Sequence, residues 1–116
     1  MDSILNHIKK LLGISSDYTH FDTDIIVHIN STLWRLRQLG VKDEKVFKIT
    51  SGKETWTDFF GDSNEVDLEA VKTYIYLKVK TIFDPPTSSF VLEAMKQQIA
   101  EYEWCLNVEA ENGSQS

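Results

Sequence analysis

The amino-acid sequence predicts an all-α protein, a small bundle of four helices with a short irregular or β-hairpin insert between the second and the third. Apolar residues recur at helical spacing in four segments. Residues that end helices follow three of these segments, namely Gly13, Gly40 and Pro85. The chain has 116 residues, 41% hydrophobic and 26% charged, which is enough for one domain with its own core and too few for two.

The first two helices are expected over residues 3–12 and 22–39. Each carries one apolar stripe with the spacing of a helix that packs one face on a core. In the second helix two residues break this pattern. Val27 and Trp34 project on the side opposite the stripe, seven residues apart, and form a second apolar patch on one face.

The insert spans residues 41–64. Residues 47–50 alternate apolar with polar, residues 51–53 resemble a turn, and residues 55–57 are a candidate returning strand, which favours a small hairpin or an extended loop. The alternative is one helical turn that starts at Trp56 and ends on Gly61.

The third helix is expected over residues 66–83. It is apolar over most of its circumference, which is typical of the central and most buried helix of a bundle. It ends before the prolines at 85 and 86, because a residue that precedes proline is pushed out of the helical region.

The fourth helix is expected to begin between residues 87 and 89 and to end near residue 108. Besides its main apolar stripe it has a second patch on the opposite side, which includes Phe90 and Trp104. The polar residues 109–116 are predicted to be a flexible tail, so the helical domain is expected over residues 1–108.

The net charge is −6, which argues against tight sequence-independent binding to the outside of duplex DNA. The sequence holds no run of about 18 uncharged apolar residues, so we expect no membrane span. The single cysteine, Cys105, cannot form an internal disulfide and fits a reducing compartment.

The patterns that carry chemistry are missing from the sequence. There is no glycine-rich phosphate loop, and the histidines are too scattered for a metal site. Acidic groups at 22 and 24 and at 65, 67 and 69 sit at predicted helix starts, where they stabilise exposed N–H groups. We expect Cys105 to be a buried packing thiol, and we expect no enzyme activity, no cofactor and no metal.

The second apolar faces offer a stronger functional signal. Either the four helices wrap around one another so fully that these faces are buried, or the faces pack against neighbouring copies or partners. On the second interpretation the candidate interface residues come from the two helices and from the insert; they are Val27, Trp34, Phe90, Trp104, Phe47, Ile49 and Trp56.

Several segments resemble the head–tail connector (adaptor) proteins of tailed bacteriophages. They are residues 21–31, 38–41, 71–79, 83–92 and 103–108. The similarity extends over residues 4–108 and is weakest in the insert, where Trp56, Phe59 and Gly61 match. At Cys105 the family more often has a basic residue.

The resemblance implies a non-enzymatic, mostly helical subunit of phages and prophages of Gram-positive bacteria. The implied homo-oligomer is a ring, twelvefold when assembled, that docks beneath the portal protein, extends the DNA channel, and carries the stopper or tail proteins. DNA would pass through without specific binding. The implied location is the virion, with the host cytoplasm during assembly.

Two different apolar faces on one subunit agree with such a ring, because ring contacts are heterologous. A negatively charged subunit also suits a channel through which DNA must slide. The alternative is a small helical protein-binding module or regulator of phage origin.

Overall fold

The computed structural model describes residues 3–41, 47–61 and 68–115, which contain five helices. The helices are α1 (Ile4–Leu11), α2 (Asp22–Gln38), α3 (Trp56–Phe60), α4 (Leu68–Phe83) and α5 (Ser89–Gln115). No strand forms among these residues, where an isolated antiparallel bridge joins Ser3 to Thr55. The all-α prediction is therefore confirmed.

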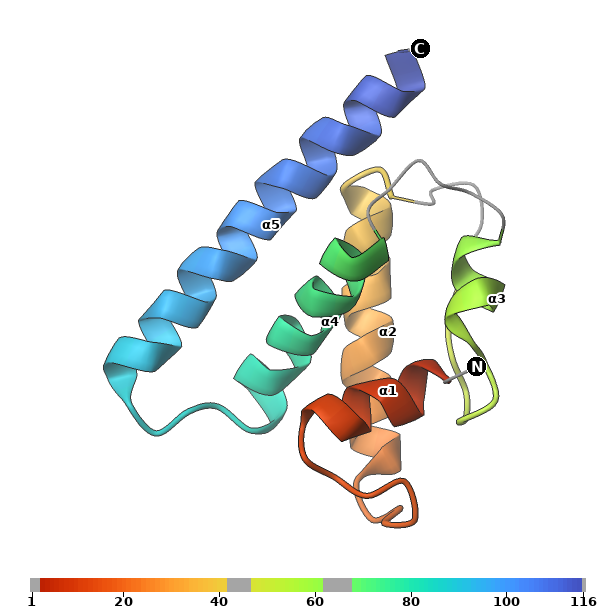
Figure 1. The fold of residues 1–116 in the computed structure, drawn as a ribbon, viewed down its shortest axis with the longest axis vertical. Coiled ribbons are helices and arrows are strands. Elements are labelled where there is room, and N and C mark those ends of the chain that lie inside the picture. The colour runs from red at the N-terminus through yellow and green to blue at the C-terminus, as the bar shows by residue number, and fades with distance from the viewer. Residues whose placement is uncertain (1–2, 42–46, 62–67, 116) are drawn as a thin grey trace.

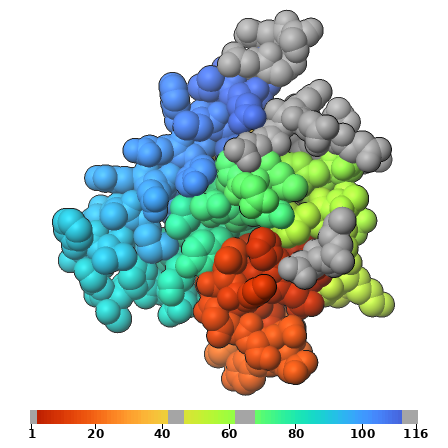
Figure 2. All heavy atoms as spheres, viewed as in Figure 1, coloured from red at the N-terminus to blue at the C-terminus, as the bar shows by residue number. Residues whose placement is uncertain are grey.

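Helix α4 lies between α2 and α5 and packs against both, while α1 crosses α2 and α4 (Figure 1). Helix α3 stands on the side of the molecule away from α5 (Figure 1). The molecule measures 43 × 35 × 19 Å, so it is flat, and α5 forms one long edge of it (Figure 2).

The core is built mainly by α1, α2 and α4. Helix α4 buries residues around most of its circumference, as expected for the central helix, and these include Val71, Tyr74, Ile75, Leu77 and Val79. The α1 and α2 stripes pack around it and supply fully buried isoleucines and leucines, namely Ile4, Ile8, Ile25, Ile29 and Leu36. The apolar residues that recur at helical spacing in the sequence are thus the residues that the fold buries.

Local signals define the ends of α1 and α2. The Ser3 hydroxyl accepts a hydrogen bond from the Asn6 N–H at 3.0 Å and caps α1. Gly13 and Gly40 follow the two helices with φ of 82° and 95°, a left-handed conformation that glycine adopts without strain.

Over its described residues, 47–61, the insert does not form a hairpin. The helical alternative for residues 56–60 is confirmed, since Trp56–Phe60 forms α3, and Gly61 follows it. A reciprocal capping box starts this helix, in which Thr55 and Asp58 each bond the other's backbone N–H. Helical spacing then buries Trp56, Phe59 and Phe60 together, which alternating strand residues cannot do.

One predicted helix boundary is wrong, and another lies outside the described residues. Helix α5 does not end near residue 108; it continues to Gln115, through most of the segment predicted as a tail. The predicted start of the third helix at residue 66, with the acidic groups at 65 and 67, lies outside the described residues.

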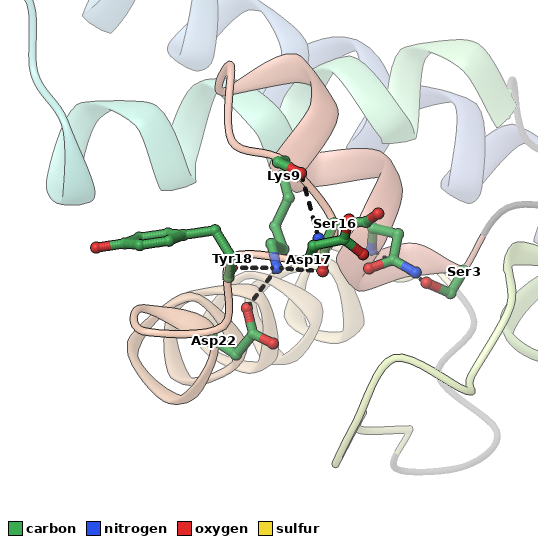
Figure 3. A network of polar contacts seen from close by, with 8 residues as sticks. Ser3, Lys9, Ser16, Asp17, Tyr18 and Asp22 are labelled. Carbon is green, nitrogen blue, oxygen red and sulfur yellow. Dashed lines mark hydrogen bonds and ion pairs between the residues drawn. The ribbon is translucent and has the colours of Figure 1, made fainter.

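Lys9 is a buried cation that ties the α1–α2 loop together (Figure 3). Its Nζ lies 2.7 Å from Asp22 Oδ1 and donates to the carbonyl oxygens of Ser16 and Tyr18 at 3.2 and 2.7 Å. A buried ammonium is stable only when it is paired and hydrogen-bonded in this way. Lys9 therefore fixes the position at which α2 begins relative to α1.

Candidate interaction surface

Helix α2 presents an apolar patch to solvent. Val27 is 56% exposed and Trp34 is 58% exposed, and seven residues place them two turns apart on the same side. Ile29 and Leu36 point to the opposite side and are fully buried. The first alternative, in which the subunit buries this second face internally, is therefore excluded.

The outer side of α5 is also apolar and exposed. Phe90 is 83% exposed and Trp104 is 69% exposed. Cys105, which we expected to be a buried packing thiol, is exposed beside Trp104, so that expectation is wrong. Cys105 lies about 100° round the helix from the buried Leu106, which places it outside the buried stripe of α5.

A polar triad joins three helices behind these exposed faces. Tyr74 of α4 donates its hydroxyl hydrogen to Glu103 Oε2 at 2.6 Å. Arg35 of α2 donates to both Glu103 oxygens, each at 3.4 Å. The side chain of Glu103 is 23% exposed, so a carboxylate of α5 is held between α4 and α2 at one point.

The triad shifts the pKa values of its members. Burial alone would raise the pKa of Glu103, but the hydrogen bonds from Tyr74 and Arg35 outweigh burial and lower it. Burial, followed by the bond to Glu103, raises the pKa of Tyr74. Glu103 is therefore ionised and Tyr74 neutral at neutral pH, which is the state in which the hydroxyl donates and the carboxylate accepts.

The insert residues proposed as interface candidates pack inside the subunit. Ile49 is 1% exposed and Trp56 is 4% exposed, while Phe47 is half-buried with its ring 5.2 Å from that of Phe59. The Asn30 side chain explains the burial of Ile49, because it accepts from the Ile49 N–H at 2.7 Å and donates to its carbonyl at 2.9 Å. Phe47, Ile49 and Trp56 therefore do not contribute to the exposed faces.

A contact that the sequence did not indicate anchors Trp56. Its Nε1–H donates to His7 Nδ1 at 3.0 Å, and the two rings meet edge-on. Lys72 Nζ lies 5.5 Å from the centre of the Trp56 ring and 3.5 Å from Glu69. His7 thus helps to pack α3 on α1. The two residues are 49 positions apart in the sequence, so no local motif indicates this pairing.

The described structure offers little for metal binding or catalysis. In the described parts of the chain, no three His, Cys, Asp or Glu side chains gather closely enough to hold a metal ion. An open cavity of about 500 Å³ lies at the end of α1, lined by Asn6, Lys10, Gly13, Ile14, Ser15 and Ser16. This lining contains no carboxylate, imidazole or thiol.

No helix within the described ranges has the length and hydropathy that a membrane span needs.

Comparison with known proteins identifies the family. A model of the family described as phage connector proteins matches residues 4–113, nearly the whole chain. The comparison with curated proteins finds no match, and neither does the comparison with solved structures. The family match agrees with the resemblance described above, which extends over residues 4–108, and continues it to residue 113. The chain belongs to the phage connector protein family.

Proposed function

We propose that this protein is a structural adaptor of a phage or prophage head–tail connector. Copies form a ring, twelvefold when assembled, that docks below the portal protein and extends the DNA channel. The ring links the capsid to the stopper or tail proteins. It is assembled in the host cytoplasm and remains in the virion.

The family match over residues 4–113 is the observation that carries this proposal. The exposed faces give it a physical basis, because a subunit that leaves two tryptophans and a phenylalanine in water has apolar surface available for partners. We assign Val27, Trp34, Phe90 and Trp104 to contacts between copies or with other connector proteins.

The charge of the chain supports the channel role. At a net charge of −6 the subunit repels the phosphate backbone, so DNA moves past a ring of such subunits without binding tightly. No enzymatic step is part of this function.

Negative-stain electron microscopy of the purified protein, with and without the portal protein of the same phage, tests the proposal. We expect rings seated on the portal. Because binding to the portal raises the local concentration of subunits, rings can form there even when the isolated protein is monomeric.

A protein that stays monomeric and never docks to the portal would contradict the proposal. A stable small oligomer with a partner outside the virion would instead support a regulator of phage origin.

A further inference from the structure

Helix α5 makes a row of contacts with the end of α2. Glu103, Asn107 and Ala110 follow one another at i, i+4 and i+7, so they share one side of α5. Glu103 pairs with Arg35, and Asn107 Nδ2 donates to the Leu39 carbonyl oxygen at 3.0 Å. We name Glu103, Asn107 and Ala110 the latch.

The third latch contact depends on a glycine. A Cβ atom at residue 40 would lie 3.2 Å from the Ala110 Cβ, so α5 approaches the end of α2 this closely because Gly40 has no side chain. Two latch contacts are polar and the third involves one methyl group. Such contacts align two helices but bury little apolar area.

The contact of α5 with α4 is apolar but shallow. A stripe of four α5 side chains at helical spacing is half-buried, and among the described side chains of α5 Leu106 alone is buried. The four are Leu92, Met95, Ile99 and Tyr102. Because α5 also lies along one edge of the molecule (Figures 1 and 2), it separates from the core at lower cost than α2 or α4.

The linker between α4 and α5, residues 84–88, favours an extended chain. It contains Pro85 and Pro86, and proline pushes the residue before it towards the extended region. From Phe83 to Ser89 an extended chain spans at most about 20 Å. The molecule is 19 Å thick, so an opened linker reaches a second copy stacked on its broad face.

Apolar side chains on both sides of the linker are uncovered. Ile82, in the last turn of α4, is 57% exposed. Phe90 and Val91, in the first turn of α5, are 83% and 45% exposed. A linker that passed between two copies would bring the surface of the neighbour over these side chains.

We propose that copies exchange α5 in the assembled ring, so that α5 of one copy seats on α4 and α2 of the next. This inference rests on the proposed function. The exchanged helix makes the same contacts that α5 makes here within one copy, so the receiving surface is already complementary to it. Exchange in one direction is a heterologous contact and closes into a ring. Isolated subunits keep α5 in place, because exchange needs the high local concentration that the portal supplies.

Charge reversal at the latch tests whether α5 acts within one copy or between copies. Glu103→Arg brings two cations together, and Arg35→Glu brings two carboxylates together. Lys78, whose charge also acts on Glu103, is the same in both variants. We expect each variant alone to lower the yield of portal-bound rings at least tenfold.

An equal mixture of the two variants is the decisive sample. With exchange, the reversed α5 of one variant seats on the reversed α2 of the other, and the two unchanged helices also meet. We expect the mixture to regain at least half of the wild-type ring yield. Without exchange every copy keeps its own like-charge contact, and mixing restores nothing.

Two controls make this result specific. The double variant with Arg35→Glu and Glu103→Arg has opposite charges in either arrangement and is expected to assemble alone. Glu103→Arg mixed with wild type has no reversed α2 to receive its α5, so this mixture should form fewer rings than the mixture of the two variants. Circular dichroism of each variant measures its helix content.

A cross-link at the latch gives a test that does not depend on charge. Gln38→Cys and Asn107→Cys, with Cys105→Ser, place two thiols beside the contact between Asn107 and Leu39. A bismaleimide added before assembly should close within one copy and lower the ring yield at least tenfold. Added to rings on the portal, it should join copies into a ladder. Gln38→Cys with Cys105→Ser has one thiol and should give no species above dimer.

Cross-links that stay within single copies in assembled rings would overturn the exchange and leave the proposed function standing. So would a mixture that assembles no better than its two components while the double variant assembles alone. A ladder in solution from a protein that never docks to the portal would overturn the proposed function and support the exchange.

Discussion

Helices α2 and α5 both expose a tryptophan, but they are held in the fold by different means. Helix α2 has 17 residues and buries five of them, which are Ile25, Ile29, Thr32, Leu33 and Leu36. Helix α5 has 27 residues, and among its described side chains Leu106 alone is buried. The rest of its inner stripe is half-buried, and the triad through Glu103 adds a polar attachment to α4 and α2.

On the proposed function, this difference separates the residues that stabilise the fold from those that serve assembly. The α1, α2 and α4 core supplies most of the buried apolar surface and therefore most of the stability. Helix α5 contributes less to the core and more to the surface, since its exposed side carries Phe90 and Trp104. Mutations in the two regions should therefore have effects of different size and kind.

The largest expected difference is between two isoleucines. Ile29→Ala removes a fully buried α2 side chain and is expected to cost about 2–5 kcal/mol of unfolding free energy. Ile99→Ala removes a half-buried α5 side chain and is expected to cost about 1–2 kcal/mol, since less apolar area is lost. Urea unfolding followed by circular dichroism measures both. Equal costs would show that α5 is as much a part of the core as α2.

Lys9→Met tests a polar contact on the core side of the molecule. It leaves the Asp22 carboxylate and two loop carbonyls without the buried ammonium, and we expect a loss of about 2–4 kcal/mol. Lys10→Met, the neighbouring exposed lysine, is the matched control and is expected to change stability by less than about 0.5 kcal/mol. Thermal unfolding measures the stability of both variants. Equal melting temperatures for Lys9→Met and Lys10→Met would mean that other contacts fix the α1–α2 loop.

Glu103→Ala tests the attachment of α5. It leaves the buried Tyr74 hydroxyl without its acceptor, and we expect a loss of about 1–3 kcal/mol. Glu101→Ala, an exposed position two residues earlier, is expected to be nearly neutral. In Glu103→Ala, backbone amides of α5 should lose their protection from hydrogen exchange before those of α2. An equal loss of protection in α2 and α5 would contradict the view that Glu103 mainly attaches α5.

The pKa of Glu103 predicts a pH effect with a definite sign. Because folding lowers this pKa, the stability that it contributes is fully present above the pKa of Glu103 in the unfolded chain. That stability is lost as the pH falls through the lower folded value. Unfolding free energies measured between pH 7 and pH 3 should fall less steeply for Glu103→Gln than for the wild type. Identical slopes would show that Glu103 is not stabilised by the triad.

Most of the core could be predicted from the sequence, because it depends on local signals. Helical periodicity marks the buried faces, and Gly13 and Gly40 mark the ends of α1 and α2. The sequence placed α1, α2 and α4 within about two residues of their observed ends where these are described, and it put Val27, Trp34, Phe90 and Trp104 on the outer sides.

Three features could not be predicted locally. The five residues of α3 are too few for periodicity to separate a helical turn from a strand, and the capping box decided between them. Ile49 is buried because Asn30 holds its backbone from nineteen residues away. The triad joins Arg35, Tyr74 and Glu103 across three helices, a pairing that depends on tertiary packing.

The most direct test of the account compares folding with assembly in Trp34→Ala and Trp104→Ala. Both side chains are more than half exposed, so we expect each change to cost less than about 1 kcal/mol and to shift the melting temperature by less than about 4 °C. Each should lower the yield of portal-bound rings at least tenfold, as loss of an interface tryptophan worth about 2 kcal/mol would. Variants that unfold, or that melt like the wild type and assemble with unchanged yield, would contradict the claim that these tryptophans serve assembly.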